Sequence, residues 1–311
     1  MNKQKIILEL NHILNTYKKR TPCSQIKVLE DRKWLPLFNN SNLSSEFAYL
    51  IAKVMGDGHL DSNFIVKFSG QEKELKKLKK IVSSILNINI KKFKIFTSKA
   101  KGIAYTLNVN DALLGRTLFC LGAPMGNKTK SNFLVPNWII ESKRNSHLFL
   151  QGLLEDELSN VKIEKKTHSN KPRLKLAKSE ELLPNLRKFL NQIRMMLYAF
   201  NVNCSVIPKK ANHRDDQTTR DLYFDIHRDK ENIIRFGDNV GFRVYEEKLK
   251  KLNECVEILK KTRHIRKPVI DVSEIVRLRK MGHSIRKISR EVNLNKTSVH
   301  NVIKKSAGEE I

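Results

Sequence analysis

Apolar residues recur at helical spacing in one segment that ends in an unusual way. The i, i+3, i+4 and i+7 positions of an amphipathic helix are filled by Phe47, Leu50, Ile51 and Val54. This stripe runs directly into an acid held between two glycines, Gly56-Asp57-Gly58, and a strand pattern begins at once. We expect Gly58 to end the helix in a left-handed conformation that a side chain would resist, which leaves Asp57 exposed at the tip.

A second helix of this type is predicted about one hundred residues later, within 145–165. Its apolar stripe consists of Leu150, Leu153 and Leu154. It closes on three consecutive acids, Glu155-Asp156-Glu157. The two predicted helices therefore share both an apolar face and an acidic end.

The patterns that follow these helices also match. In the first half we expect strands around residues 64–68, 93–95 and 105–109, and helices over 71–86 and 111–121. In the second half we expect strands around 161–163, 174–176, 206 and 222–226, and helices over 179–193 and 230–240. Two similar halves imply pseudo-twofold symmetry. The predicted fold class is α+β, built from a pseudo-twofold duplicated αββαββα unit.

The C-terminal pattern differs from both halves. Residues 273–305 contain three short helical patterns, of which the second is capped by Ser284, and a tight turn at 293–295 leads to the third. The stretch around Pro268 marks the boundary with the preceding residues. We therefore expect a separate, small all-α domain in the tail.

Charge is the strongest global signal. The 311 residues include 60 Lys and Arg against 32 Asp and Glu, a formal net charge of +28. Such an excess repels itself in the folded state, and a polyanionic partner relieves it with release of counterions. Double-stranded DNA is the expected partner. A membrane is not expected, because no apolar run approaches the ~18 residues of a span.

The cysteines and the N-terminal segment indicate the cellular compartment expected for the protein. Cys23, Cys120, Cys204 and Cys255 are far apart and form no Cys-x-x-Cys pair. Neither a zinc site nor a disulfide framework is expected, and a reducing, cytoplasmic setting fits. Residues 1–20 lack a small-residue cleavage site, so we interpret them as a helix of the mature protein and not as a signal peptide.

Polar side chains are expected on one face of each sheet. The apolar side of every strand packs on helices, whereas the other side carries hydrogen-bonding residues that can contact base edges or phosphates. These are Asn63, Lys67, Thr106, Asn108, Asn110, Lys162, Arg173, Lys175, Tyr223, Asp225 and His227. On a chain of this charge, we predict a saddle that faces DNA.

The two acid-ended helices resemble the paired motifs of the LAGLIDADG homing endonucleases, in their single-chain archaeal form. The copies read LIAKVMGDG over 50–58 and LQGLLEDEL over 150–158, and the segment 121–139 resembles the family's connection between halves. The resemblance covers roughly residues 42–260. It implies that the motif helices pack along a pseudo-twofold axis, with small residues at the contact. The matching positions are Ala52, Gly56 and Gly152.

The same resemblance implies that Asp57 and Glu157 are the catalytic, metal-binding acids. Two carboxylates brought together on a dyad repel each other and so hold hard divalent cations, here Mg2+ or Mn2+. Such metals activate water and stabilise charge on the phosphate, and one acid per half lets each half cut one strand. Candidates for assisting lysines or phosphate contacts are Lys99, Lys101, Lys209 and Lys210.

The second motif departs from the family pattern. Leu158 stands where the pattern has Gly, and Asp156 stands where the first motif has Gly56. A leucine in left-handed geometry costs roughly 1 kcal/mol or more, so we expect a differently shaped helix end. A nicking enzyme or an inactive DNA binder is then an alternative.

The tail resembles a resolvase-like helix-turn-helix. From residue 260 to 305, fourteen basic residues stand against three acidic ones, a net charge of +11. The exposed start of the third helix is expected to enter the major groove. It consists of Lys296, Thr297, Ser298, His300 and Asn301. A small protein-interaction module is the alternative.

Together these patterns predict four parts: an extension (1–41) whose Trp34 packs on the first repeat, the repeats 42–143 and 144–262, and a helix-turn-helix domain (268–305). The expected function is a site-specific, metal-dependent double-strand DNA endonuclease associated with intron homing. We expect a monomer with internal pseudo-twofold symmetry. The alternatives are an inactive LAGLIDADG-plus-helix-turn-helix transcription regulator and an intron RNA maturase. A self-splicing insert is not expected, because the chain starts with Met1-Asn2 and lacks a splicing nucleophile.

Overall fold

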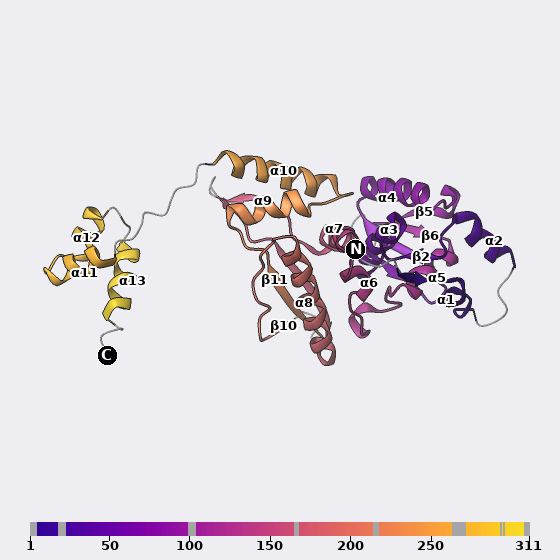
Figure 1. Cartoon of the computed structure of the whole chain (residues 1–311), viewed down its shortest axis with the longest axis horizontal. Coiled ribbons are helices and arrows are strands. Elements are labelled where there is room, and N and C mark those ends of the chain that lie inside the picture. The colour runs from indigo at the N-terminus through magenta and orange to yellow at the C-terminus, as the bar shows by residue number, and fades with distance from the viewer. Residues whose placement is uncertain are drawn as a thin grey trace. The chain divides into compact units, whose positions relative to one another are not determined.

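The computed structural model describes residues 5–17, 23–98, 104–164, 168–213, 218–262, 272–292, 294 and 296–307. The chain folds as two compact units, Met1–Lys261 and Thr262–Ile311. The first unit contains both predicted halves, and Figure 1 shows them on either side of two central helices, α3 and α7.

The first half follows the predicted order of elements. Its elements are α3 (Asn42–Met55), β3 (His59–Leu60), β4 (Val66–Gly70), α4 (Glu72–Ile85), β5 (Phe93–Ser98), β6 (Ala104–Val109) and α5 (Ala112–Cys120). The antiparallel strands lie in the order β3-β4-β6-β5. Val66 pairs with Val109 and Phe68 with Leu107. These buried side chains share one sheet face, and α4 and α5 contact these strands.

The second half repeats this arrangement. Its elements are α7 (Lys143–Glu157), β7 (Ile163–Glu164), β8 (His168–Ser169), β9 (Arg173–Ser179), α8 (Leu183–Ala199), β10 (Asn212–His213), β11 (Thr219–Asp225), α9 (Lys230–Asn239) and α10 (Glu246–Lys261). The strand order is β10-β11-β9, and a single bridge joins Leu158 to Leu174 of β9. Leu158 thus takes the place that β3 has in the first sheet. The predicted α+β fold with two like halves is confirmed.

Two details of the prediction were wrong. The strand expected near Val206 does not form: Val206 is 77% exposed, and residues 205–208 have no regular structure. The N-terminal segment is not one helix, because Ile6–Leu8 forms strand β1 ahead of α1 (Leu10–Leu14). β1 pairs with β2 (Leu37–Phe38), so its backbone groups find partners in another strand. Residues 1–4 and 18–22 lie outside the described residues.

The rest of the extension packs on the first half, as expected for Trp34. It includes α2 (Cys23–Arg32). Trp34 is buried, and its Nε1 donates to the carbonyl oxygen of Leu86 at 3.1 Å. At the end of α2, Arg32 donates to both carboxylate oxygens of Asp111 at 3.0 and 2.6 Å. Contacts between residues far apart in sequence therefore hold the extension in place.

The central helices α3 and α7 approach closely through small residues. A Cβ placed on Gly152 would lie 2.8 Å from the carbonyl oxygen of Tyr49 and 3.0 Å from the Cβ of Ala52. At their N-terminal ends, the buried Asn145 accepts hydrogen bonds from Ser44 and Ser45 at 3.2 and 2.9 Å. These contacts fix how the helices pair, and therefore where both C-terminal ends lie. The connection between them contains the short helix α6 (Asn137–Ile140).

The second unit has the three-helix pattern expected of the tail, with α11 (Val272–Lys280), α12 (Ile285–Glu291) and α13 (Lys296–Ala307). Ser284 caps α12 by accepting from the backbone N–H of Lys287. The small core consists of Ile275, Leu278, Ile288 and Val299. Across both units, none of the described helices combines the length and apolar character that crossing a bilayer requires.

Candidate active site at the ends of the two central helices

The two predicted acids come to the same end of the central helix pair. Asp57 follows the C-cap of α3, and Glu157 is the last residue of α7. Burial raises the pKa of Glu157 to about 8, and the nearby carboxylates of Asp57 and Asp156 act in the same direction. The pKa of Asp57 is raised as well, first by loss of hydration and then by Asp156. Acids from the two halves therefore interact electrostatically.

The end of α3 is shaped differently from our expectation, whereas the end of α7 agrees with it. Gly58 has no positive φ; a Cβ there would lie 2.5 Å from the carbonyl oxygen of Lys53, so close approach is what excludes a side chain. Leu158 has φ −84° and ψ 133°, which is ordinary extended backbone. It is buried and bridges Leu174. Leu158 thus avoids the costly left-handed geometry, and the differently shaped helix end that we expected there is confirmed.

Two lysines that the sequence analysis missed close the C-terminal ends of the helices. The amine of Lys128, from the turn after the first half, donates to carbonyl oxygens of Val54, Gly56 and Gly58. The amine of Lys248, from α10, donates to carbonyl oxygens of Glu155 and Leu158 at 2.6 and 2.7 Å. A cation is favourable at a helix C-terminus because the last carbonyls lack partners within the helix. Each helix end thus combines one acid with one capping lysine.

Both lysines are close to the acids. Burial lowers the pKa of the Lys128 amine, while Glu157 and Asp57 oppose the change. Burial likewise lowers the pKa of Lys248, which senses the charges of Asp156 and Asp57. In the sequence, Lys248 stands among the many lysines of an amphipathic helix, so no local pattern sets it apart. Only the return of α10 to the end of α7 reveals its position.

Of the three consecutive acids that end α7, two are engaged inside the helix interface. Glu155 is fully buried and accepts a hydrogen bond from the hydroxyl of Tyr49 at 2.6 Å. Asp156 forms an ion pair with Lys53, and neither side chain is more than 2% exposed. Glu157 is the acid of the three that lines a neighbouring pocket.

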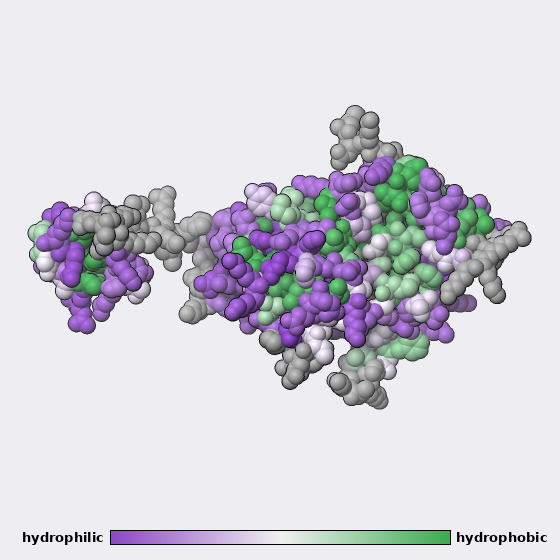
Figure 2. Space-filling view, turned by 90° about the horizontal axis from the view of Figure 1, so that it is seen from below, coloured by the Kyte–Doolittle hydropathy of each residue, from purple (hydrophilic) through white to green (hydrophobic). Residues whose placement is uncertain are grey.

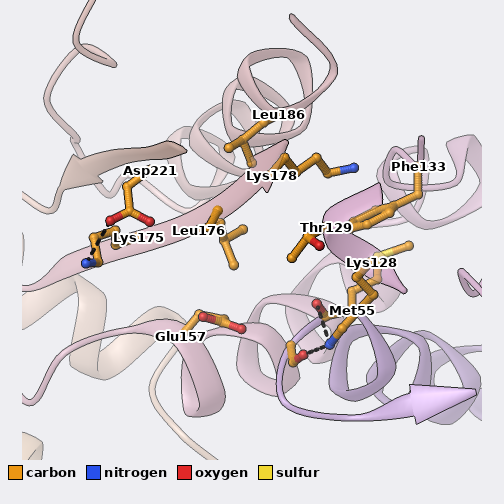
Figure 3. Close-up of a pocket in the computed structure, with 12 residues that line it drawn as sticks. Met55, Lys128, Thr129, Phe133, Glu157, Lys175, Leu176, Lys178, Leu186 and Asp221 are labelled. Carbon is orange, nitrogen blue, oxygen red and sulfur yellow. Dashed lines mark hydrogen bonds and ion pairs between the residues drawn. The ribbon is translucent and has the colours of Figure 1, made fainter. Parts of the chain in front are cut away.

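This pocket lies beside the end of α7 and has a volume of about 320 Å³. Its polar lining includes Lys128, Glu157, Lys175, Lys178 and Asp221. Figure 3 shows Glu157 on one side of the open space and the strand that carries Lys175 and Lys178 on the other. Two carboxylates and three amines line this cavity, and Lys175 is paired with Asp221. Amines so placed can offset the charge of a phosphate group.

The acids fit a divalent cation by their chemistry. Among the residues that the structure describes, no group of three or more His, Cys, Asp or Glu side chains is arranged to hold a metal. Asp57 and Glu157 nevertheless supply carboxylate oxygens from opposite helices, and their pKa values are raised first by burial and then by neighbouring carboxylates. Hard cations accept such oxygens and complete their shells with water or phosphate oxygens.

The predicted DNA-facing residues of the first sheet form a row. Asn108 is the register partner of Lys67 on one side and of Lys94 on the other. The amine of Lys67 lies 3.3 Å from a carboxylate oxygen of Asp61. The Oδ1 atom of Asn108 is buried and has no hydrogen-bond partner among the described residues. This sheet face therefore carries amines, and beneath them a buried amide oxygen with unused hydrogen-bonding capacity.

On the corresponding face of the second sheet, aspartates partly neutralise the basic side chains. Lys175 lies 3.0 Å from a carboxylate oxygen of Asp221. Arg173 bonds to Asp225 at 2.7 Å and lies over the ring of Tyr223 at 3.9 Å. Figure 2, which keeps the horizontal axis of Figure 1, shows hydrophilic residues spread over the part of one face that the second half occupies.

The remaining predicted contacts lie elsewhere. Lys209 and Lys210 are exposed in the irregular segment before β10, where Arg187 donates to the carbonyl oxygen of Lys209. Lys99 and Lys101 lie outside the described residues. In the second unit, α13 exposes Lys296, Thr297, His300 and Asn301, with Ser298 half-buried.

Comparison with known proteins gives partial matches. No family model matches the chain. It is 31% identical over 255 residues to the DNA-directed RNA polymerase subunit Rpo1N of Methanocaldococcus jannaschii, covering 76% of this chain and 19% of that protein. It is 29% identical over 240 residues to the tRNA-splicing ligase RtcB of Methanopyrus kandleri, covering 72% and 23%. The chain therefore spans about a fifth of the length of these relatives.

A third relative is the replication factor C small subunit of Methanocaldococcus jannaschii, 24% identical over 200 residues, which cover 61% of this chain and 11% of that protein. Among solved structures, I-DmoI in complex with DNA and Ca is 17% identical, covers 67% of this chain and 97% of that one, and has a TM-score of 0.42. The homing endonuclease I-WcaI bound to its DNA recognition sequence is 15% identical, covers 71% and 96%, and has a TM-score of 0.41.

Proposed function

We propose that this chain is a site-specific, metal-dependent DNA endonuclease of the LAGLIDADG type. The observation that carries the proposal is the pairing of Asp57 and Glu157 at the adjacent ends of α3 and α7, each beside a lysine that caps its helix. Neighbouring carboxylates beside fixed cations are typical of a site for phosphoryl chemistry. An ordinary turn between a helix and a strand does not require this arrangement.

The residues have distinct roles in this proposal. Asp57 and Glu157 hold the divalent cation, and Mg2+ or Mn2+, when bound, supplies Lewis acidity and a water of lowered pKa. Lys128 and Lys248 place positive charge beside the acids, where charge develops on the scissile phosphates. The polar sheet faces, with Lys67, hold the duplex backbone in register.

The names of the curated relatives describe activities other than that of a nuclease. They describe an RNA polymerase subunit, a tRNA-splicing ligase and a replication factor. The chain matches 23% or less of each of these three proteins. When a chain matches only a small part of three differently named proteins, the shared part is best explained as a module that is distinct from the rest of each protein. We therefore do not assign ligase activity to this chain.

The tail is proposed to add a second contact with the duplex. Its described helices form a separate core, and the start of α13 exposes several polar side chains and Lys296. A helix presented in this way fits the major groove. Because the tail is joined to the first unit, binding of that unit holds the tail near the DNA. This high effective concentration would raise the overall affinity for the duplex.

The test is cleavage of plasmids that carry candidate target sites, with purified protein and Mg2+. The parent should linearise a cognate plasmid, whereas Asp57→Asn should lose cleavage and still bind the same DNA in EDTA. Tight, specific binding by the parent without cleavage at any site would reject the nuclease. It would instead support a DNA-binding regulator, for which Asp57→Asn should make no difference.

A further inference from the structure

Asp156 belongs to the second motif, but its carboxylate binds to the C-terminal end of the first motif helix. Its Oδ2 atom accepts a hydrogen bond from the backbone N–H of Asp57 at 3.1 Å. Its other oxygen forms the ion pair with Lys53 of α3. The Asp156 side chain is fully shielded from solvent. This carboxylate thus crosses between the helices and binds the residue that follows the C-cap of α3.

The surroundings hold Asp156 in one position. A Cβ placed on Gly56 would lie 2.6 Å from Asp156 Oδ2 and 2.8 Å from its Cβ, so the glycine makes room for this side chain. Lys53 is 2% exposed and its amine lies 4.3 Å from the ring centre of Tyr245. A buried ion pair with these neighbours has little freedom to rearrange.

Among the described residues, no equivalent contact is made at the end of the second motif helix. Positions one hundred residues apart correspond, so Leu153 matches Lys53 and Gly56 matches Asp156. A glycine offers no carboxylate, and Glu157 is instead the last residue of helix α7 itself. Asp57, by contrast, stands beyond the end of α3. The two acids are therefore held by different means.

We infer that Asp156, fixed by Lys53, is a positioning residue for Asp57. The inference rests on the proposed function, because it assigns Asp156 to the centre that uses Asp57. Its hydrogen bond fixes the backbone at the helix exit, and this determines where the Asp57 carboxylate lies. Loss of the bond should therefore slow the strand cut that depends on Asp57 more than the cut that depends on Glu157.

The first test needs no activity. Hydrogen exchange of the Asp57 amide is followed by NMR in the free protein. The main variant is Lys53→Met with Asp156→Leu, which removes both charges of the pair, substitutes apolar side chains of similar length and branching, and leaves no acceptor for the amide. Replacing a buried ion pair by apolar residues is often neutral for folding. We expect exchange at Asp57 to accelerate on the order of tenfold.

Two single variants sharpen this test. Asp156→Asn keeps an acceptor oxygen and should preserve slow exchange at Asp57. Tyr49→Phe is the matched control, because it removes another hydrogen bond between α3 and α7, to Glu155, without contact to Asp57. It should leave exchange at Asp57 unchanged. Equal exchange at Asp57 in the parent and the double variant would overturn the inference.

The second test resolves the two DNA strands. Cleavage of each strand is first compared in Asp57→Asn and in Glu157→Gln. The strand whose cleavage is slowed more by Asp57→Asn is taken as the strand that depends on Asp57. The double variant should slow this strand on the order of tenfold relative to the other, so nicked DNA accumulates, whereas Tyr49→Phe should slow neither strand selectively. Equal slowing of both strands by the double variant would overturn the inference. A parent that cuts neither strand rejects the proposed function and leaves the exchange test to decide the positioning role.

Discussion

The amine of Lys128 donates to the carbonyl oxygen of Gly58 at 2.8 Å, and so ties the connection between the halves to the chain around Asp57. Lys128→Met should remove this tie together with the positive charge beside the acids. We expect cleavage to fall by about a hundredfold, the scale seen when one stabilising donor is lost. Single-turnover cleavage, measured well below the melting temperature, checks this.

The control for Lys128 lies in the same turn. Lys130 is exposed, so Lys130→Met removes an equal charge without touching the end of α3. It should change cleavage by less than about threefold. Equal losses in both variants would show that only the overall charge of the turn matters.

Stability of the metal-free protein should depend on the protonation of Glu157. Its pKa is raised from 4.5 to about 8 in the folded chain. Between these values the folded state holds a proton that the unfolded state has lost, so raising the pH through this window weakens folding. The melting temperature of the parent in EDTA should fall as the pH rises towards 8.

Glu157→Gln isolates this effect, because glutamine has no ionisation to couple to folding. The variant should show a smaller decrease in melting temperature across the same pH range. If parent and variant follow parallel curves, Glu157 does not carry the raised pKa.

Close approach of the central helices should make Gly152 sensitive. Gly152→Ala places a methyl group 2.8 Å from the carbonyl oxygen of Tyr49, so the helices must separate. We expect a loss of about 1–3 kcal/mol in the free energy of unfolding, measured with urea. Gly237→Ala is the control, because its methyl would meet the side chain of Val256 and not backbone. A larger loss there would contradict the predicted ranking.

The tail should contribute to DNA affinity through Lys296 at the start of α13. Lys296→Ala should weaken binding to all sequences alike and reduce the slope of log K against log salt by about one, as expected for one lost phosphate contact. Fluorescence anisotropy at several salt concentrations checks this in EDTA. Unchanged affinity and slope would indicate that α13 does not meet the duplex.

Periodic patterns were sufficient to predict most of the fold. Apolar stripes located α3 and α7, and alternation located β4, β6, β9 and β11, because burial of one face imposes those periods. The strand near Val206 failed because pairing there is limited to an isolated bridge between Cys204 and Ile226, and Val206 itself is exposed. The pattern alone could not distinguish an exposed valine from a buried one.

The candidate site was only partly accessible to such reasoning. The positions of Asp57 and Glu157 were named from motif resemblance, and the structure brings them to the same end of the helix pair. Lys128 and Lys248 were missed because each lies tens of residues from the helix that it caps. The role of Asp156 was also hidden, since one acid among three consecutive acids gives no sign that its partners, Lys53 and Asp57, belong to the other half.

The ion pair between Lys53 and Asp156 also limits how the halves can be exchanged. A molecule assembled from two copies of the first half would bury each lysine against a glycine, and one assembled from two copies of the second would bury each aspartate against leucine. Either arrangement leaves charges without counterparts in a dry interface. The two halves therefore depend on each other and cannot be interchanged. A DNA target that both halves contact has no reason to be a palindrome.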